Sequence, residues 1–489
     1  MTDLKIKSSN GTEKTLDADR VNSLKGELKG KLLTAGDAGY DEARTIWNAM
    51  IDRRPAIIVQ PAGVDDVVAA VNFARENELL LSIRGGGHNI AGNAVCDGGM
   101  MLDLSGMNKV TVDTNARTAN VGPGARLADF DREAQAHALA TPLGINSTTG
   151  VAGLTLGGGF GWLSRKYGTT VDNLLSADVV TADGKQVRAS ESENSDLFWG
   201  LRGGGGNFGV VTNFEYRLHP FGPNVLTGLI VFPFDEAKQV LQKYRDAVKT
   251  MPEDLNVWVV LRKAPPLPFL PENIHGKEVV IFAVFYAGDE AEGMKLIEPL
   301  KSFGTPVGQF IGVQPYTAWQ QAFDPLLTPG ARNYWKSHNF AELPDDAIDV
   351  VIKYVSELPT PQTEIFFGLV GGQASRVAED ATAYSQRDAL WACNVHGRWE
   401  NSSDDQKVIS WARAFFDASA PYSTGGVYVN FMTEDEKARV KSAYKPEVWQ
   451  RLVDLKSKWD PTNLFRMNQN ISPKGSREFK EKRDRLGFF

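Results

Sequence analysis

The chain is poor in cysteine, in histidine and in long apolar runs. Its two cysteines, Cys96 and Cys393, cannot build a disulfide framework. Together with six scattered histidines they lack the spacing of a zinc site, so we expect no metal. No run of about 18 apolar residues is present, and we therefore expect no membrane-spanning helix. Residues 1–7 include three charged side chains and no apolar run, so we expect no secretory signal and a cytoplasmic protein.

The overall composition is that of a globular protein. Apolar residues make up 42% of the chain and charged residues 23%. A length of 489 residues predicts two domains rather than one. The formal net charge of −7 argues against nucleic acid or an anionic membrane as a partner, although a solvated surface explains the charge equally well.

The most informative stretch is Ser82-Ile83-Arg84-Gly85-Gly86-Gly87-His88-Asn89. The apolar run at 79–83 predicts a buried strand that leads into the glycines. Backbone amides can approach a ligand closely there because no Cβ intervenes, and consecutive N–H groups form a concavity that binds anions. Tight turns use the same residues, so this loop alone is weak evidence.

A second glycine-rich segment spans residues 150–161, with the sequence Gly-Val-Ala-Gly-Leu-Thr-Leu-Gly-Gly-Gly-Phe-Gly. Two amide-rich loops suit the two phosphates of a dinucleotide such as FAD better than a mononucleotide. A third glycine tract, 203–206, precedes an expected strand at 210–218. The sequence contains neither a nucleophile elbow nor a Walker-type loop.

Several further segments complete a known pattern: Leu102-Asp103-Leu104-Ser105, Lys166-Tyr167-Gly168, Asp172-Asn173-Leu174, residues 198–212 and residues 460–466. With the two loops, they lie in order along nearly the whole chain. In this pattern the sequence resembles the vanillyl-alcohol oxidase superfamily, and within it the berberine-bridge-enzyme-like oxidases. The resemblance implies an α+β, two-domain flavoprotein in which an antiparallel-sheet substrate domain is inserted into a discontinuous FAD-binding domain.

We expect four parts along the chain: a mobile or loosely docked N-terminal arm (1–37), an FAD-binding domain (38–220), the substrate domain (221–440) and a C-terminal return to the FAD-binding domain (441–489). A short helix is expected at 41–50. The helical periodicity of 64–77, between strands at 56–59 and 79–83, predicts a β-α-β unit with a parallel pair. Strands at 177–181 and 186–189 flank a hairpin turn. Beyond 220, strand-like and helical runs alternate, which indicates a predominantly antiparallel sheet.

The resemblance implies that FAD is bound covalently through the imidazole of His88, although a lone histidine beside glycines is more often structural. A substituent at that place on the flavin makes it a better hydride acceptor, so the protein tunes the cofactor. The other residues that we expect to bind the cofactor are Arg84, Gly85, Gly86, Gly87, Asn89, Gly92, Thr149, Gly150, Gly153, Gly157, Gly158, Val211, Asn430, Asn468 and Asn470.

Many family members add a second link from a cysteine in the second loop. Counting back from Gly157 puts Asn146 at that position, with Ser147 next, and neither can form the bond. Cys96 lies in another loop, where we interpret it as a small apolar filler, so we expect a singly attached flavin. At Thr149, a valine in the family admits oxygen and a leucine blocks it. Threonine has the size of valine, which favours an oxidase over a dehydrogenase.

On the substrate side, alternation along residues 425–431 puts Tyr428 and Asn430 on one face of an expected strand. Several relatives use a tyrosine here as the base, so Tyr428 is the leading catalytic candidate; a core tyrosine is the alternative. Its pKa would have to be lowered from about 10. His396, the second catalytic candidate, and Arg398 share a face of the expected strand 392–399 and are candidates for that tuning, or ordinary polar residues of the sheet. Four further residues are expected either to line the wall of the substrate pocket or to pack in the core: Tyr316, Gln320, Tyr334 and Trp335.

The sequence thus predicts an FAD-dependent oxidase that moves a hydride from a C–H group bearing O–H or N–H to covalently bound flavin and reduces O2 to H2O2. The alternatives are a dehydrogenase with another electron acceptor and a flavin-binding protein without turnover. The expected partners are a small-molecule substrate and O2, and the expected state is a monomer or homodimer. Sugars, amines, alcohols and secondary metabolites all remain open as substrates.

Overall fold

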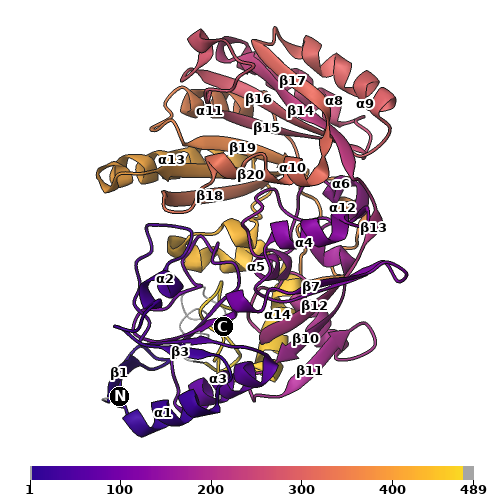
Figure 1. The fold of residues 1–489 in the computed structure, drawn as a ribbon. Helices are drawn as coiled ribbons and strands as arrows, with labels where there is room; N and C mark the ends of the chain where they lie inside the picture. The colour runs from indigo at the N-terminus through magenta and orange to yellow at the C-terminus, as the bar shows by residue number, and fades with distance from the viewer. Residues whose placement is uncertain (1–2, 477–489) are drawn as a thin grey trace.

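The computed structural model describes residues 3–476. A seven-stranded sheet forms the upper half of the molecule in Figure 1, in the order β17-β14-β16-β15-β19-β20-β18. Every neighbouring pair in it is antiparallel, which confirms the expected sheet type. Its strands are β14 (Asn224–Pro233), β15 (Leu255–Lys263), β16 (Glu278–Tyr286), β17 (Gly308–Pro315), β18 (Arg332–Phe340), β19 (Glu364–Leu369) and β20 (Trp391–Trp399).

Three amphipathic helices cover one face of this sheet: α8 (Ala237–Val248), α11 (Asp345–Val355) and α13 (Asp405–Ser419). In α8, buried Val240, Leu241 and Tyr244 recur at helical spacing, which gives the helix one apolar side. Because side chains alternate along a strand, the residues between those that meet the helices point to the opposite face. That face, which includes Trp258 and Phe366, is free to line a cavity.

The lower half holds a four-stranded sheet in the order β3-β4-β6-β5, formed by β3 (Lys31–Leu33), β4 (Ile57–Gln60), β5 (Leu81–Arg84) and β6 (Met100–Asp103). Strands β4 and β5, joined by α3 (Val64–Glu76), are each parallel to β6, which lies between them. The expected β-α-β unit is present, but the prediction that its two strands pair directly is wrong. All four residues of β6 are buried, as a central strand requires.

A five-stranded antiparallel sheet in the order β11-β10-β12-β8-β7 completes this half. It contains β7 (Val110–Asp113), β8 (Thr118–Val121), β10 (Leu174–Val180), β11 (Gln186–Ser190) and β12 (Val210–Arg217), and the predicted β10–β11 hairpin is confirmed. The remaining elements used below are α4 (Leu127–Gln135), α5 (Val151–Leu156), α6 (Ser164–Tyr167), α7 (Ser195–Leu201), α9 (Glu290–Ile297), α10 (Tyr316–Gln321) and α12 (Gln373–Arg376).

The N-terminal segment is packed, so the prediction of a mobile or loosely docked arm is wrong. Strands β1 (Leu4–Lys7) and β2 (Glu13–Leu16) pair, and α1 (Ala18–Glu27) follows. Their apolar side chains, Ile6, Leu16, Val21 and Leu24, are buried in the same cluster as α3. Polar residues dominate the segment, but the few apolar ones share one side. The helix expected at 41–50 is limited to α2 (Tyr40–Arg44).

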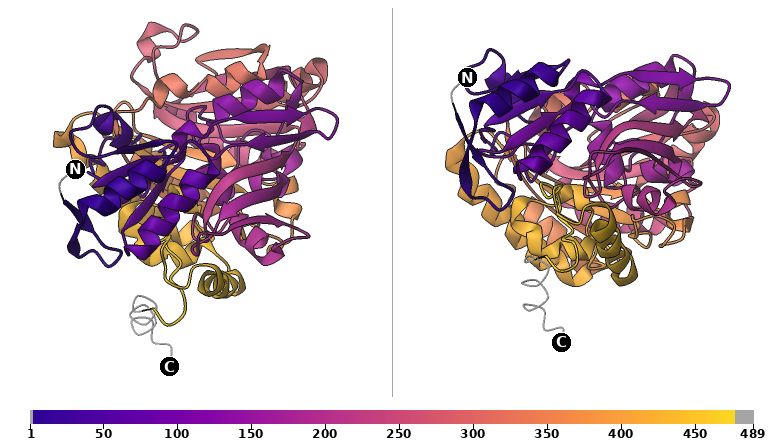
Figure 2. Two further views of the ribbon diagram at one scale, coloured as in Figure 1. Left: turned by 60° about the horizontal axis from the view of Figure 1, so that its bottom comes forward. Right: turned by 90° about the horizontal axis from the view of Figure 1, so that it is seen from below.

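The C-terminal helix α14 (Pro446–Trp459) packs against α7, with Leu452 and Leu455 in one buried cluster with Phe198. Figure 2 shows this yellow segment beside the indigo and purple N-terminal half. A buried ion pair of 2.7 Å between Lys456 and Asp460 lies at the end of the helix. The domain limits at 37, 220 and 440 stay predictions, and residues 477–489 of the predicted return lie outside the described part.

Candidate active site

A cavity of about 520 Å³ lies between the open face of the seven-stranded sheet and the glycine loops of the other half. This volume is within the range of about 300–1,000 Å³ that is typical of ligand and cofactor sites. Both glycine loops, the third glycine tract and residues 465–469 line one part of it. Side chains of β15, β19 and β20 line the other part.

The two predicted loops meet in a cradle that has room for backbone only. A Cβ on Gly86 would lie 2.4 Å from the Cα of Gly150, and one on Gly85 would lie 2.8 Å from the carbonyl oxygen of Pro123. Within residues 3–476, the backbone N–H groups at 86–89 donate no hydrogen bond. Four consecutive open donors fit an anionic group such as a diphosphate. The cradle therefore fits FAD.

His88 lies in the cavity wall directly after this cradle. Its ring stacks on Trp47, with ring centroids 5.1 Å apart and an interplanar angle of 20°. Its Nε2 lies 3.0 Å from the hydroxyl oxygen of Thr148. Burial, helped by the charge of Arg126 and opposed by a hydrogen bond with the Thr148 backbone, lowers the pKa of His88 to about 3. The imidazole is therefore neutral at physiological pH and retains one lone pair.

Tyr428 lines the same cavity but does not lie on a strand, so that prediction is wrong. It precedes a single 3-10 turn at Val429–Phe431, in which the N–H of Phe431 bonds back to the Tyr428 carbonyl oxygen at 2.9 Å. The turn still brings the expected pair together, because Asn430 Nδ2 donates to Tyr428 Oη at 3.0 Å. The N–H of Gly159 donates to the same oxygen at 3.0 Å.

Burial raises the pKa of the Tyr428 phenol, and the hydrogen bond from Asn430 offsets only part of this. The phenol is therefore protonated at neutral pH, contrary to the expected lowering. His396 and Arg398 do lie on β20, but in the described chain neither makes a hydrogen bond to Tyr428. Burial, Asn430, Tyr384 and Gly159 set the pKa of Tyr428, so the structure favours the alternative that His396 and Arg398 are polar residues of the sheet held by other groups.

His396 belongs to a buried polar cluster in the cavity wall. Its Nδ1 lies 3.3 Å from Glu364 Oε1 and its Nε2 lies 3.2 Å from Asn333 Oδ1. Glu364 also pairs with Arg262 at 2.8 Å. Burial lowers the pKa of His396, and Glu364 opposes this shift. Arg398 instead donates to the Thr328 carbonyl oxygen at 2.6 Å and lies over the Trp47 ring.

The predicted cofactor residues divide into two groups by position. Those that line the cavity are Gly85, Gly86, Gly87, His88, Asn89, Thr149, Gly150, Gly153, Val211, Asn430 and Asn468. Five others, Arg84, Gly92, Gly157, Gly158 and Asn470, do not line it. Arg84 turns away to pair with Asp103 at 3.2 Å. Cys96 is fully buried outside the cavity, as expected of an apolar filler.

Two family models match the chain. One, described as an FAD binding domain, matches residues 55–190, and the other, described as berberine and berberine like, matches residues 427–472. An FAD-linked oxidoreductase from Dictyostelium discoideum is 31% identical over 459 residues, which cover 93% of this chain and 97% of the relative. The chain belongs to the berberine-bridge-enzyme-like FAD-linked oxidoreductases.

This berberine-bridge-enzyme-like protein is also 31% identical over 467 residues to (R)-6-hydroxynicotine oxidase from Paenarthrobacter nicotinovorans, with 92% of this chain and 98% of the relative covered. The crystal structure of 6-hydroxy-D-nicotine oxidase from Arthrobacter nicotinovorans superimposes with a TM-score of 0.82 at 29% identity, covering 91% of this chain and 98% of the other. The expected α+β fold of the vanillyl-alcohol oxidase superfamily is confirmed.

The substrate side of this berberine-bridge-enzyme-like cavity is largely aromatic. Of the four predicted wall residues only Trp335 lines it; Tyr316 is in the core, Gln320 bonds to Asp131, and Tyr334 bonds to Asp435. Sequence reasoning missed Trp47, Thr148, Trp258, Arg262, Glu364, Phe366 and Asn394. Asn394 could have been found, since it alternates with His396 along β20. Trp47 carries no such signal, because its place depends on contacts with distant segments.

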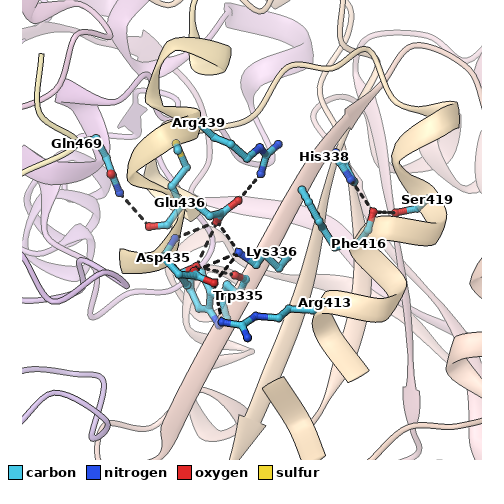
Figure 3. Close-up of polar contacts among 12 residues, drawn as sticks. Trp335, Lys336, His338, Arg413, Phe416, Ser419, Asp435, Glu436, Arg439 and Gln469 are labelled. Atoms are coloured by element: carbon cyan, nitrogen blue, oxygen red, sulfur yellow. Dashed lines mark hydrogen bonds and ion pairs between the residues drawn. The ribbon is translucent and has the colours of Figure 1, made fainter. Parts of the chain in front are cut away.

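The segment after Tyr428 is fixed to the sheet by a charge cluster (Figure 3). Lys336 of β18 lies 3.1 Å from Asp435 and 3.6 Å from Glu436, and Arg413 of α13 lies 2.9 Å from Asp435. Burial raises the pKa of Asp435, but hydrogen bonds from Tyr334 and Thr433 outweigh it and hold the pKa below its ordinary value. The cluster therefore ties the segment at 435–436, which follows Tyr428 in the chain, to β18 and α13.

No helix among residues 3–476 is both long and apolar enough to cross a membrane. Over the same residues, His, Cys, Asp and Glu form no group of three or more that could hold a metal ion.

Proposed function

We propose that this FAD-linked oxidoreductase is an oxidase whose FAD is bound covalently through His88. The main support is one juxtaposition: the open N–H cradle leads directly to a neutral imidazole, and both line a cavity that continues to the aromatic face of the sheet. Held there by the cradle and His88, FAD would supply hydride chemistry: the acceptance of a hydride from a substrate carbon bearing O–H or N–H, with the electrons passed to O2 to give H2O2.

The residues of the chain have separate tasks in this proposal. The N–H groups at 86–89 would hold the diphosphate, and His88, stacked on Trp47, would carry the flavin. Trp258, Trp335 and Phe431 exclude water from the reacting end of the cavity.

Tyr428 is the group to which we assign the proton of the substrate O–H or N–H. Its oxygen receives two hydrogen bonds, from Gly159 and Asn430, and these donors stabilise the negative charge that develops there. Because burial raises the pKa of Tyr428, only a small fraction is ionised at neutral pH, and the rate should rise with pH. His396 is the second candidate, but an acceptor oxygen lies beside each of its ring nitrogens.

Thr149 lies in the cavity wall and has the volume of valine, which favours O2 as the electron acceptor. A dehydrogenase that passes its electrons to another acceptor is the alternative. The substrate is a small molecule from the sugars, amines, alcohols or secondary metabolites. A cytoplasmic location and a monomeric or homodimeric state stay predictions.

Attachment is tested on protein precipitated with acid. The pellet should stay yellow, and the tryptic peptide that contains His88 should carry the mass of the flavin. His88→Ala should bind FAD without a covalent bond and oxidise substrate more slowly. A colourless wild-type pellet would contradict covalent attachment. Flavin on the tryptic peptide that contains Cys96 would show that the bond is made by a residue other than His88.

A further inference from the structure

Three side chains form a hydrogen-bonded row behind the imidazole of His88. The hydroxyl oxygen of Thr148 lies 2.7 Å from Asn146 Oδ1 and 3.0 Å from His88 Nε2. The backbone N–H of Thr148 also donates to Asn146 Oδ1, at 3.0 Å. Since an N–H must meet an acceptor, this second contact identifies the atom of Asn146 as the amide oxygen.

The row fixes where each proton lies. An amide oxygen has no proton to give, so the short contact between it and Thr148 requires the hydroxyl proton to lie between the two oxygens. The lone pairs of the hydroxyl oxygen then face His88 Nε2, and Nε2 must carry a proton. Because the ring is neutral, Nδ1 keeps the lone pair. Within residues 3–476, Nδ1 makes no hydrogen bond, and the ring lines the cavity.

We propose that Thr148 and Asn146 are positioning residues that hold the His88 proton on Nε2 and so present the Nδ1 lone pair to the 8α-methyl carbon of the flavin. This inference rests on the covalent attachment proposed above. In the overall balance, a C–N bond replaces one C–H bond of that methyl group and the N–H bond of the imidazole. The two electrons and two protons released go to O2, which becomes H2O2.

The position of Asn146 in the second loop explains why its amide matters for His88. It stands where many relatives carry the cysteine of a second flavin link, and in this chain its amide serves His88 instead. Without that amide, the Thr148 hydroxyl is free to turn its proton toward Nε2, which would move the imidazole proton to Nδ1. The loop itself is held by Asp324, whose Oδ1 accepts the N–H of Ser147 at 3.0 Å.

The first test compares how much of the bound flavin is covalent. Thr148→Val removes the hydroxyl and keeps the shape, and Thr148→Ser keeps a hydroxyl. Thr141→Val removes a buried hydroxyl that has no hydrogen-bond partner within residues 3–476. The readout is acid-stable flavin as a share of total flavin, followed over time with added FAD. We expect attachment about three- to tenfold slower in Thr148→Val, the effect of one hydrogen bond, and near wild-type attachment in the other two. Wild-type attachment in Thr148→Val would overturn the proposal.

The second test reads the tautomer directly and does not depend on attachment. Histidine is labelled with nitrogen-15, and the His88 signal is the one missing from His88→Ala. Before attachment, wild type should show the proton on Nε2, and Thr148→Val should show a mixture of tautomers. If wild type binds FAD only non-covalently, the attachment proposal is wrong. This spectrum then tests by itself whether Asn146 and Thr148 hold the His88 proton on Nε2. A proton on Nδ1 in wild type would overturn that role, as would identical spectra in wild type and Thr148→Val.

Discussion

Gly86 and Gly150 lie back to back, so close that a Cβ on Gly86 would come within 2.4 Å of both the Cα and the N of Gly150. This contact joins the loop after β5 to the loop before α5. It places open N–H groups, His88 and Thr149 around one end of the cavity. The absence of two side chains is therefore what allows the cradle to form.

Gly86→Ala should separate the two loops, because the methyl group would overlap the backbone of Gly150 rather than a side chain that can move. Overpacking of this kind costs about 1–3 kcal/mol. The FAD content of the purified variant should fall severalfold, and its Tm should fall as well. Gly106→Ala is the matched control, since in the described part of the chain a Cβ there meets no atom within 4 Å. A variant with wild-type FAD content and Tm would show that the contact is dispensable.

Thr149→Leu should slow the reaction of the reduced enzyme with oxygen, because the longer side chain crowds the cavity wall. We expect a loss of about tenfold or more, equivalent to about 1.4 kcal/mol. Thr149→Val keeps the volume and should react almost as wild type does. Rapid mixing of reduced enzyme with aerated buffer measures the rate. Equal rates for the leucine and valine variants would remove Thr149 as a gate.

Tyr428→Phe removes the phenol oxygen and nearly conserves volume, so FAD content should survive. Anaerobic flavin reduction by a substrate should slow by at least about tenfold, since a positioned base is typically worth about 100- to 10,000-fold. Because burial raises the pKa of Tyr428, the wild-type rate should climb with pH into the alkaline range, above the free-phenol value of about 10.

That alkaline rise should be absent from Tyr428→Phe and present in Tyr316→Phe, a control in the core. An unchanged rate and pH profile in Tyr428→Phe would exclude the tyrosine as the base. His396 would then be the group to change next.

Asp435 should make the free energy of unfolding decrease at acid pH. Its pKa is lowered in the folded protein, so its contribution is complete above the unfolded value of about 3.9 and is lost as the pH falls through the folded value. Asp435→Asn removes one of the two carboxylate partners of Lys336 and the carboxylate that pairs with Arg413, and it should cost about 1 kcal/mol at neutral pH because solvent screens these partly exposed pairs. Urea unfolding at neutral and acid pH measures this. A variant as stable as wild type at neutral pH would contradict the role of the cluster.

The sequence predicted those parts of the site that depend on local chain chemistry. The glycines at 85–87 and 150 can be recognised from the local sequence alone, and His88 follows the first of these segments directly in the chain. Alternation also put His396 and Arg398 on the correct strand. These features are local, or they repeat with a period that can be counted.

The remaining parts depend on contacts between distant segments. The alternation around Tyr428 indicated a strand, but the chain turns there, and Asn430 meets the phenol all the same. Whether that phenol has a raised or a lowered pKa follows from burial, which a sequence does not show. The role of Thr148 requires His88, Asn146 and the direction of each hydrogen bond to be known together.

Oxygen reactivity is the most direct test of the proposed oxidase, and it does not require the substrate to be known. The enzyme is reduced anaerobically by light, mixed with aerated buffer in a stopped-flow instrument, and assayed for peroxide. The account predicts rapid and complete reoxidation, with H2O2 formed in an amount equal to the flavin. Reduced enzyme that persists in aerated buffer, yet is reoxidised at once by an artificial acceptor, would contradict it and identify a dehydrogenase.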